Sequence, residues 1–168
     1  MNTSDPQDEL FPIVDENDKV IGKMTRKIAH QSPNLIHRAV AIFVQNRRGN
    51  LLIQKRSKTK DTSPECWMYS VGGHVGYGEE YVSTAAKEIK EELGVSVPQE
   101  DLVFIGKTLI SSAVEKEIIE VYRCVVEDNI AFKPTMEKVS EVVFVDKEKL
   151  KKMLKEENWT PAAIQIIP

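Results

Sequence analysis

A glycine-rich segment that leads directly into an amphipathic helix constrains the fold of this chain most strongly. Residues 71–78 contain four glycines, a composition typical of a loop. From Glu79 to Leu93, apolar residues recur at three- and four-residue spacings, and Gly94 follows where a helix would end. We therefore expect a loop over residues 71–78 and a helix over residues 79–93 that packs its apolar stripe against another layer.

The segments around this helix alternate between apolar runs and turn residues, which is typical of strands. A polar turn at residues 15–18 separates the first two runs and predicts an N-terminal β-hairpin. A second turn, which contains Gly49, separates the next two runs, and the polar, basic residues 56–64 indicate a loop. The expected strands lie at residues 9–14, 19–24, 37–45, 51–54, 102–110, 117–126 and 142–145.

The C-terminal part of the chain adds two further helices. Asp146 precedes an amphipathic segment as an N-cap residue would, and Thr160 with Pro161 can open a short last helix. Strands mixed with helices predict an α/β (α+β) sandwich in which the helices pack on a mixed sheet. A length of 168 residues predicts a single domain over residues 1–168, with residues 1–8 as a flexible tail.

Charge and cysteine content exclude several classes of function. A formal net charge of -3 gives no global attraction to nucleic acid or to an anionic membrane, so an anionic ligand needs a local basic patch. Two cysteines are too few for a disulfide framework, and the N-terminus lacks the pattern of a signal peptide, which indicates the cytoplasm. The longest apolar run, residues 39–44, is far below the ~20 residues of a membrane-spanning helix.

The predicted helix carries three carboxylates on one face. Glu88, Glu91 and Glu92 are three and four residues apart, and the apolar stripe lies elsewhere. A solvated acidic face is the simplest alternative, but like charges at these spacings repel each other unless a cation neutralises them. Oxygen ligands without thiolate favour Mg²⁺ or Mn²⁺, and the preceding glycines let the backbone approach a metal and a phosphate.

Together these residues resemble a Nudix box, the signature of a family of diphosphate hydrolases. The match runs from Gly73 through Glu79 to the segment Lys87-Glu88-Ile89-Lys90-Glu91-Glu92-Leu93-Gly94-Val95. The resemblance implies an α/β/α sandwich, Mg²⁺ held by Glu88, Glu91 and Glu92 with help from the Gly73 carbonyl, and a supporting role for Glu79. Metal-activated water would attack the diphosphate while a glutamate accepts a proton.

One position departs from that family's pattern. Lys87 stands where an arginine usually orients a catalytic glutamate, and lysine cannot form the same bidentate contact. We expect altered or reduced catalysis rather than none. The same departure leaves open a non-catalytic sensor of a diphosphate ligand as an alternative to an enzyme.

A second set of residues lies outside the box. A lone histidine is more often structural than a ligand, but Glu115 and Glu117, two residues apart, would share one face of a strand whose other members are apolar. If the strand began only at Ile118, both glutamates would instead be solvated in a turn. The candidate residues for a second divalent metal are His30, His37, His74, Glu115 and Glu117.

These residues match the metal-binding pattern of type 1 isopentenyl-diphosphate isomerases, which the chain resembles from about Pro12 to Val126. The resemblance also implies that Arg26, Arg56 and Lys60 hold a diphosphate. The isomerases have an essential cysteine where this chain has Gly72, and Cys66, whose expected role is packing, is no substitute. Their C-terminal catalytic tryptophan is replaced by Ala162.

Hydrolysis of a diphosphate linkage is therefore the leading hypothesis, because the glutamates of the box are present and the isomerase cysteine is absent. The expected substrate is a small diphosphate, such as a nucleoside diphosphate derivative, and an isomerase-like activity is the alternative enzyme. Aromatic residues near the glycines, such as Tyr69, could stack on a base or belong to the core. The oligomeric state stays open.

Overall fold

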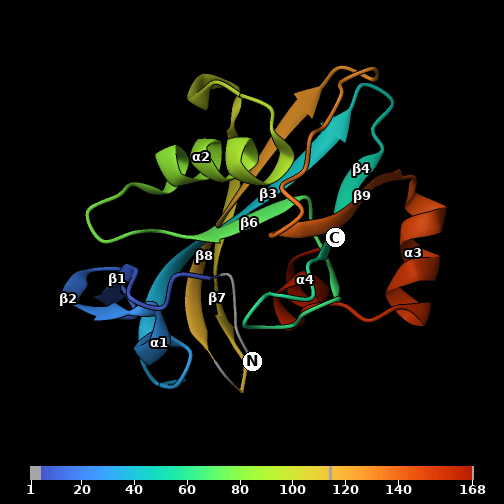
Figure 1. Cartoon of the computed structure of the whole chain (residues 1–168). Helices are drawn as coiled ribbons and strands as arrows, with labels where there is room; N and C mark the ends of the chain where they lie inside the picture. The colour runs from blue at the N-terminus through green and yellow to red at the C-terminus, as the bar shows by residue number, and fades with distance from the viewer. Residues whose placement is uncertain (1–4, 114, 168) are drawn as a thin grey trace.

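The computed structural model describes residues 5–113 and 115–167, and within them a nine-stranded sheet is flanked by helices (Figure 1). The helices are α1 (Arg26–Ala29), α2 (Tyr81–Leu93), α3 (Lys147–Glu156) and α4 (Pro161–Ile166), with a 3-10 turn at Gln99–Asp101. The strands are β1 (Leu10–Val14), β2 (Val20–Thr25), β3 (Ile36–Asn46), β4 (Leu51–Arg56), β5 (Trp67–Met68), β6 (Val71–His74), β7 (Val103–Ser111), β8 (Lys116–Val126) and β9 (Val139–Val145).

Strand β3 is the hub of this sheet. It pairs in parallel with β8 and antiparallel with β1, β4 and β6. Strand β7 extends the sheet beyond β8, and β9 extends it beyond β4. Parallel and antiparallel pairs thus occur together, and the predicted mixed sheet is confirmed.

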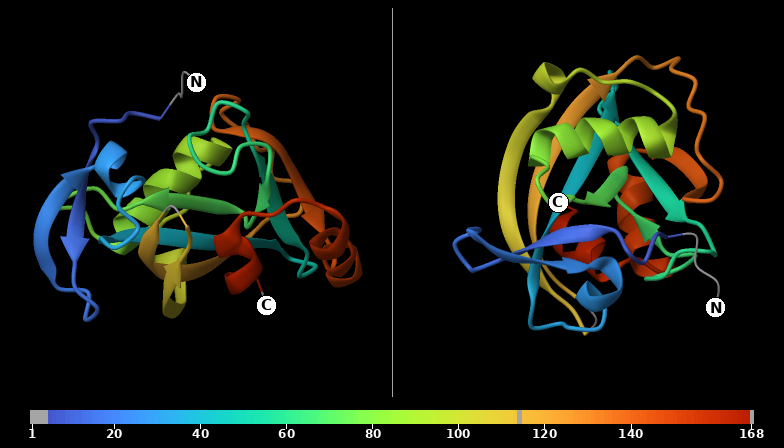
Figure 2. Two further views of the ribbon diagram at one scale, coloured as in Figure 1. Left: turned by 90° about the horizontal axis from the view of Figure 1, so that it is seen from below. Right: turned by 60° about the vertical axis from the view of Figure 1, so that its left-hand side comes forward.

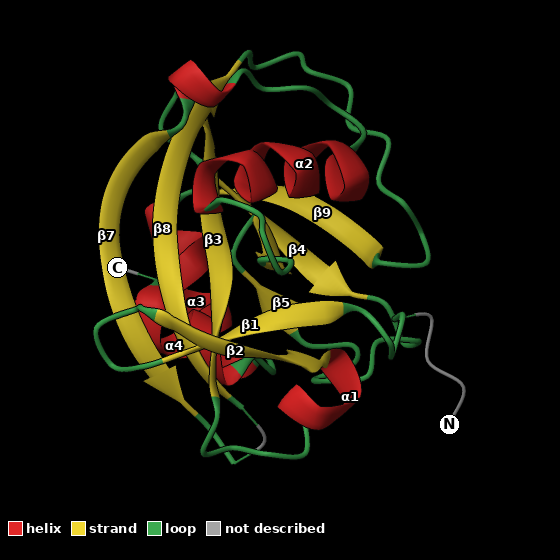
Figure 3. Cartoon of the chain, turned by 90° about the vertical axis from the view of Figure 1, so that its left-hand side faces the viewer, coloured by secondary structure: helices red, strands yellow, loops and turns green. Residues whose placement is uncertain are grey.

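The helices cover both faces of the sheet (Figure 3). Ala85 and Ile89 of α2 pack against Val40 and Ile42 of β3 on one face. On the other face, the core that contains Phe43 includes residues of α3 and α4. Figure 2 shows this three-layer arrangement from two further sides, and the predicted α/β/α sandwich is confirmed.

The boundaries of the helices follow their expected capping residues. Helix α2 ends at Gly94, which adopts a φ of 69° and donates its N–H to the Lys90 carbonyl. The side chain of Asp146 accepts from the Lys149 N–H to open α3, and that of Thr160 accepts from the Ala163 N–H to open α4. Every helix in residues 5–113 and 115–167 is too short or too polar to traverse a lipid bilayer.

The prediction of a loop over residues 71–78 is wrong for its first half. Residues 71–74 form β6, in which Gly73 pairs with Val40 and His74 with Ala39 of β3. Glycine weakens a strand in isolation, but a neighbouring strand that supplies hydrogen bonds overrides that preference. Because successive strand residues face opposite sides, β6 presents Gly73 to α2 and Gly72 to Tyr69.

The N-terminal region contains the predicted hairpin, β1 with β2, and the short helix α1, which was not predicted; β5, after the loop that follows β4, was not predicted either. The expected flexible tail over residues 1–8 lies partly outside the described residues. In its described part, Asp5 is buried, and its carboxylate lies 2.5 Å from Lys60 Nζ. An ion pair with a buried partner anchors this segment to the domain, so a free tail is wrong at this position.

Candidate active site

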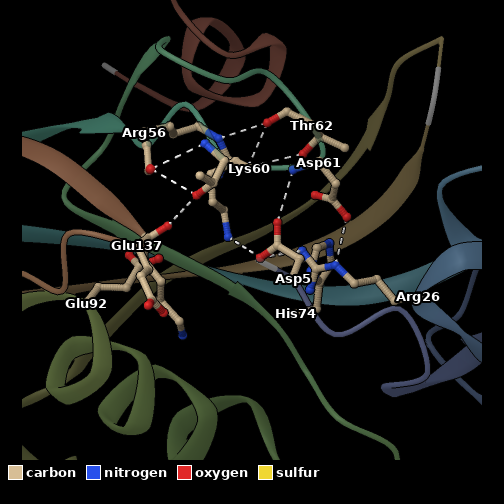
Figure 4. A network of polar contacts seen from close by, with 12 residues as sticks. Asp5, Arg26, Arg56, Lys60, Asp61, Thr62, His74, Glu92 and Glu137 are labelled. Atoms are coloured by element: carbon tan, nitrogen blue, oxygen red, sulfur yellow. Dashed lines mark hydrogen bonds and ion pairs between the residues drawn. The ribbon is translucent and has the colours of Figure 1, made fainter. Parts of the chain in front are cut away.

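Two clusters of metal-ligand residue types meet at one cavity of 350 Å³, whose lining includes Glu88, Glu91 and Glu92 from the first and His74, Glu115 and Glu117 from the second. One cluster consists of Glu88, Glu91 and Glu92 on α2 and is called here the glutamate cluster. The other consists of His30, His37, His74, Glu115 and Glu117 and is called here the histidine cluster. Across the cavity from α2, the loop after β4 and the N-terminal segments carry basic side chains, as Figure 4 shows around Arg56 and Lys60.

Gly73 allows the glutamate cluster to pack against β6. Glu88 and Glu92 are buried, at 8% and 4% exposure, while Glu91 is more open to solvent. A Cβ atom added at Gly73 would lie 2.5 Å from both Cγ and Cδ of Glu88. Only glycine leaves room for the Glu88 side chain at this point, which accounts physically for the glycine at the start of the box.

Burial and mutual repulsion disfavour ionisation of this cluster. Burial and the charge of Glu92 together raise the pKa of Glu88 to about 7, against the opposing effect of Lys138. Burial likewise raises the pKa of Glu92. Carboxylates in this state gain a favourable partner when a divalent cation binds, so their chemistry fits the Mg²⁺ or Mn²⁺ that the sequence predicted.

Two further residues contact these carboxylates and were missed from the sequence. Gln54 is buried in β4, and its Nε2 lies 2.7 Å from Glu92 Oε2. Lys138 Nζ lies 2.6 Å from Glu91 Oε2 and 3.5 Å from Glu88 Oε2. Gln54 could have been noticed in the sequence, because it is a polar residue in the apolar run of β4. Lys138 could not, because it follows a loop whose path the sequence does not indicate.

Lys87 pairs with Glu79 rather than with the glutamate cluster. Its Nζ lies 2.8 Å from both carboxylate oxygens of Glu79, which also accepts hydrogen bonds from Thr84 Oγ1 and the Gly76 N–H. Burial would raise the pKa of Glu79, but these hydrogen bonds outweigh it and lower the pKa. These contacts fasten the glycine loop to α2, and the supporting role of Glu79 in the metal site stays a prediction.

The fold brings all five residues of the histidine cluster together from different elements. Ligand atoms of His30, His37, His74 and Glu115 all lie within 4.8 Å of one another. Glu117 Oε1 is 3.2 Å from His74 Nε2. Glu117 belongs to β8, pairs in register with His37 of β3, and is 6% exposed. The alternative in which Glu115 and Glu117 are solvated in a turn is therefore wrong.

The protonation states of this cluster fit a cation. Burial lowers the pKa of His74 to about 3, so its imidazole is neutral and able to act as a ligand. Burial, together with the charge of Glu117, raises the pKa of Glu115 to about 8. Within residues 5–113 and 115–167 the buried Nδ1 of His37 has no hydrogen-bond partner, and its Nε2 lies 3.5 Å from Glu117 Oε1. Imidazole and carboxylate ligands with an orphaned nitrogen suit a divalent metal.

Asp61 lies behind the histidine cluster and was also missed from the sequence. Its Oδ2 lies 3.1 Å from His30 Nδ1 and 3.0 Å from Arg26 Nε. When His30 Nδ1 carries the proton, it donates a hydrogen bond to the Asp61 carboxylate, and His30 Nε2, 3.5 Å from Glu115 Oε2, is left to act as the ligand atom. A carboxylate in this position orients a metal-binding histidine.

The three basic residues predicted to hold a diphosphate all line the cavity, but they differ in how far they are already paired. Arg26 is 6% exposed and contacts the carboxylates of Asp5, Glu9 and Asp61. Lys60 pairs with Asp5. Arg56 donates to the carbonyl and hydroxyl of Thr62, neutral groups, so its charge is more available to an anionic ligand.

The position of the isomerase cysteine is occupied by other side chains. A Cβ atom at Gly72 would lie 2.8 Å from Cε of Met68 and 2.8 Å from Cε2 of Tyr69. Tyr69 is itself buried, and burial raises the pKa of its phenol. A cysteine could be accommodated here only if both the Tyr69 ring and the terminal methyl of Met68 moved.

Comparison with known proteins finds relatives named as Nudix hydrolases and relatives named as isopentenyl-diphosphate isomerases. The family model of the NUDIX domain matches residues 35–167. An Arabidopsis thaliana chloroplastic isopentenyl-diphosphate Delta-isomerase is 28% identical over 96% of this chain and 62% of its own length. A Streptomyces coelicolor protein named as a Nudix hydrolase is 39% identical over 58% of this chain and 54% of its own length.

A solved structure extends the similarity over nearly the whole chain. A Deinococcus radiodurans protein superposes with a TM-score of 0.74 at 25% identity, covering 94% of this chain and 96% of that one. The chain spans less than two thirds of the length of the curated relatives described above. Since the family model covers most of the chain and the fold agrees, the chain belongs to the NUDIX domain family.

Proposed function

We propose that this protein hydrolyses a diphosphate linkage in a small molecule, such as a nucleoside diphosphate derivative, with a divalent metal. The observation that carries this proposal is the packing of Glu88 against Gly73, which gathers the glutamate cluster on the wall of the cavity. Buried carboxylates with raised pKa values are costly unless they bind a cation or exchange a proton, and hydrolysis uses both properties.

Different residues of the cavity would bind the metal, accept the proton and bind the phosphate. Bound Mg²⁺ or Mn²⁺ would neutralise diphosphate oxygens and lower the pKa of a water molecule. Glu88, Glu91 and Glu92 would hold the metal, and one of these carboxylates would accept the proton of the attacking water. As the new phosphorus–oxygen bond forms, the anhydride bond breaks and the leaving phosphate carries away the bonding electrons. Gln54 fixes Glu92 in place, and Arg56 supports the phosphate charge.

The test is a panel of nucleoside diphosphate derivatives and prenyl diphosphates with Mg²⁺ or Mn²⁺, with each product identified. We expect metal-dependent release of a phosphate-containing product from at least one nucleoside compound, and loss of that release in Glu92→Gln. Absence of any phosphate-containing product across the panel would refute the proposal. The masses of the products would also identify the bond that breaks.

Isomerisation of isopentenyl diphosphate is the second candidate, favoured by the histidine cluster and by the names of the curated relatives. Gly72 argues against it, since glycine offers no side chain for proton transfer and Tyr69 fills the adjacent space. Formation of dimethylallyl diphosphate by the unmodified protein would establish this activity. Its absence, with hydrolysis observed, would leave the histidine cluster as a second metal site of a hydrolase.

A further inference from the structure

We propose that Lys138 is a diphosphate-binding residue that pairs with Glu88 and Glu91 until a metal takes these carboxylates. This inference rests on the proposed function, because it assigns a ligand contact within the same cavity. The starting observation is that the Lys138 ammonium lies 2.6 Å from Glu91 Oε2 and 3.5 Å from Glu88 Oε2. These oxygens belong to the side chains that are the predicted metal ligands.

The backbone that carries Lys138 is fastened to the end of α2. Thr135 donates its N–H to the Glu92 carbonyl at 3.1 Å and its hydroxyl to the Glu91 carbonyl at 2.6 Å. Lys133 donates its N–H to the Leu93 carbonyl, and Lys138 donates its own to the Thr135 carbonyl. The segment therefore caps the helix, and a rigid attachment holds Lys138 beside the glutamate cluster.

The ammonium and a divalent cation compete for the same oxygens. Lys138 brings one positive charge to two carboxylates, those of Glu88 and Glu91, and Lys87 is engaged with Glu79. A divalent cation brings twice that charge and repels the ammonium, so metal binding releases the lysine side chain. The side chain is 31% exposed and lines the cavity, so it can turn toward the opening.

Lys138 differs from Lys60 and Arg26, two other basic residues of the cavity, because its carboxylate partners are the predicted metal ligands. Lys60 pairs with Asp5, and Arg26 pairs with Asp61, and neither carboxylate belongs to the glutamate cluster. Metal bound by the glutamate cluster leaves those pairs intact. The same metal breaks the ion pairs of Lys138 with Glu88 and Glu91. The oxygens of a metal-bound diphosphate are then the nearest new anionic partners for the Lys138 ammonium.

Two binding measurements test the exchange. Calorimetric titration gives the affinity for Mn²⁺ alone, and a second titration with methylenediphosphonate, a non-hydrolysable probe, is made in saturating Mn²⁺. In Lys138→Met we expect Mn²⁺ to bind several-fold more tightly, because its competitor is gone. We expect the diphosphonate to bind about tenfold or more weakly, as for the loss of one charge-assisted hydrogen bond.

Two further variants make the result specific. Lys138→Arg keeps the charge and should hold diphosphonate affinity within a few-fold of the original. Lys133→Met, at an exposed position on the same segment, should change neither affinity. Equal melting temperatures verify that the variants fold.

Weaker Mn²⁺ binding in Lys138→Met, or unchanged diphosphonate binding, would overturn the inference. Neither titration depends on turnover. The protein could hydrolyse no compound of the panel while Lys138→Met still binds Mn²⁺ more tightly and the diphosphonate more weakly. That result would support the role of Lys138 and refute the proposed hydrolysis.

Discussion

The glutamate cluster and the histidine cluster meet at the same cavity but are assembled in different ways. Glu88, Glu91 and Glu92 come from one helix, and the pitch of that helix alone places them on one face. The histidine cluster comes from the segments around α1, β3, β6 and β8. One cluster needs only local structure, and the other needs the complete sheet.

The clusters also differ in what surrounds them. Behind the histidine cluster, Asp61 holds His30 and is itself held by Arg26, so a second layer of charge fixes the ligand. The glutamate cluster has instead a lysine placed directly on its carboxylates. A site whose ligands are fixed from behind is suited to permanent metal occupancy, and a site covered by an exchangeable cation is suited to metal that enters with substrate. The following variants test this distinction.

The largest expected effect is a difference between the two clusters in how much the hydrolysis rate falls when one of their residues is replaced. Glu92→Gln should lower the rate of diphosphate hydrolysis by roughly 10²–10⁴-fold, because it removes a buried carboxylate from the metal and from proton transfer. His30→Gln should cost much less if the histidine cluster has a supporting role. Steady-state rates at saturating Mn²⁺ measure both, and equal losses would mean that the two clusters act as a single catalytic centre.

Gly73→Ala should damage the glutamate cluster through its packing. The new Cβ would meet Glu88 at 2.5 Å, and a displacement of about 1 Å at a reacting group can cost on the order of 10²-fold in rate. Gly106→Ala is the matched control, because a Cβ there meets no heavy atom within 4 Å. If both variants keep full activity, the position of Glu88 is less critical than its contact with Gly73 implies.

Asp61→Asn should affect the histidine cluster selectively. Loss of the carboxylate behind a metal-binding histidine typically lowers metal affinity 10–100-fold, so we expect a reduction of about that size. Titration with Mn²⁺ in a Glu92→Gln background isolates this site from the glutamate cluster. Asp128→Asn, which removes a carboxylate paired with Arg48 away from the cavity, is the control. Unchanged affinity in Asp61→Asn would show that His30 needs no fixed partner.

The same contrast explains what the sequence could predict. The helix, its glutamates and its end at Gly94 follow from local periodicity and capping, and all three agree with the structure. The loop predicted at residues 71–74 failed because pairing with β3 is non-local. The histidine cluster could be named only through resemblance, since spacing along the chain gives no reason for His30 and Glu115 to meet.

Residues that act through a neighbouring side chain were the hardest to predict. Asp61 and Lys138 lie in or next to polar loops, where charged residues are ordinarily solvated. Their roles depend on which atoms they face, and loop paths are set by contacts with elements far away in sequence. Gln54 is intermediate, because an amide within a buried strand demands a partner even before that partner is known.

The smallest expected effect concerns stability in metal-free protein, where both clusters lack their cation. Folding raises the pKa of Glu88 from its ordinary 4.5 to about 7 and that of Glu115 to about 8. A raised carboxyl pKa stabilises the fold below pH 4.5, and this contribution is lost as pH rises through the folded pKa. The lowered pKa of His74 acts in the opposite direction below about pH 6.5, because the unfolded imidazole binds a proton that the folded one does not. With a chelator present, the melting temperature should therefore fall between about pH 6.5 and pH 8, by roughly 2–4 °C for each kcal/mol lost.

Two variants resolve the contribution of each cluster to this fall. Glu88→Gln should flatten the dependence near pH 7, and Glu115→Gln should flatten it about one pH unit higher, because an amide does not titrate. Added Mn²⁺ should remove most of the fall in the unmodified protein, since the cation stabilises the ionised carboxylates. A melting temperature that rises over this range without metal would mean that the two carboxyls are compensated within the fold. Neither cluster would then need a cation for its charge, and the electrostatic argument for metal at both would fail.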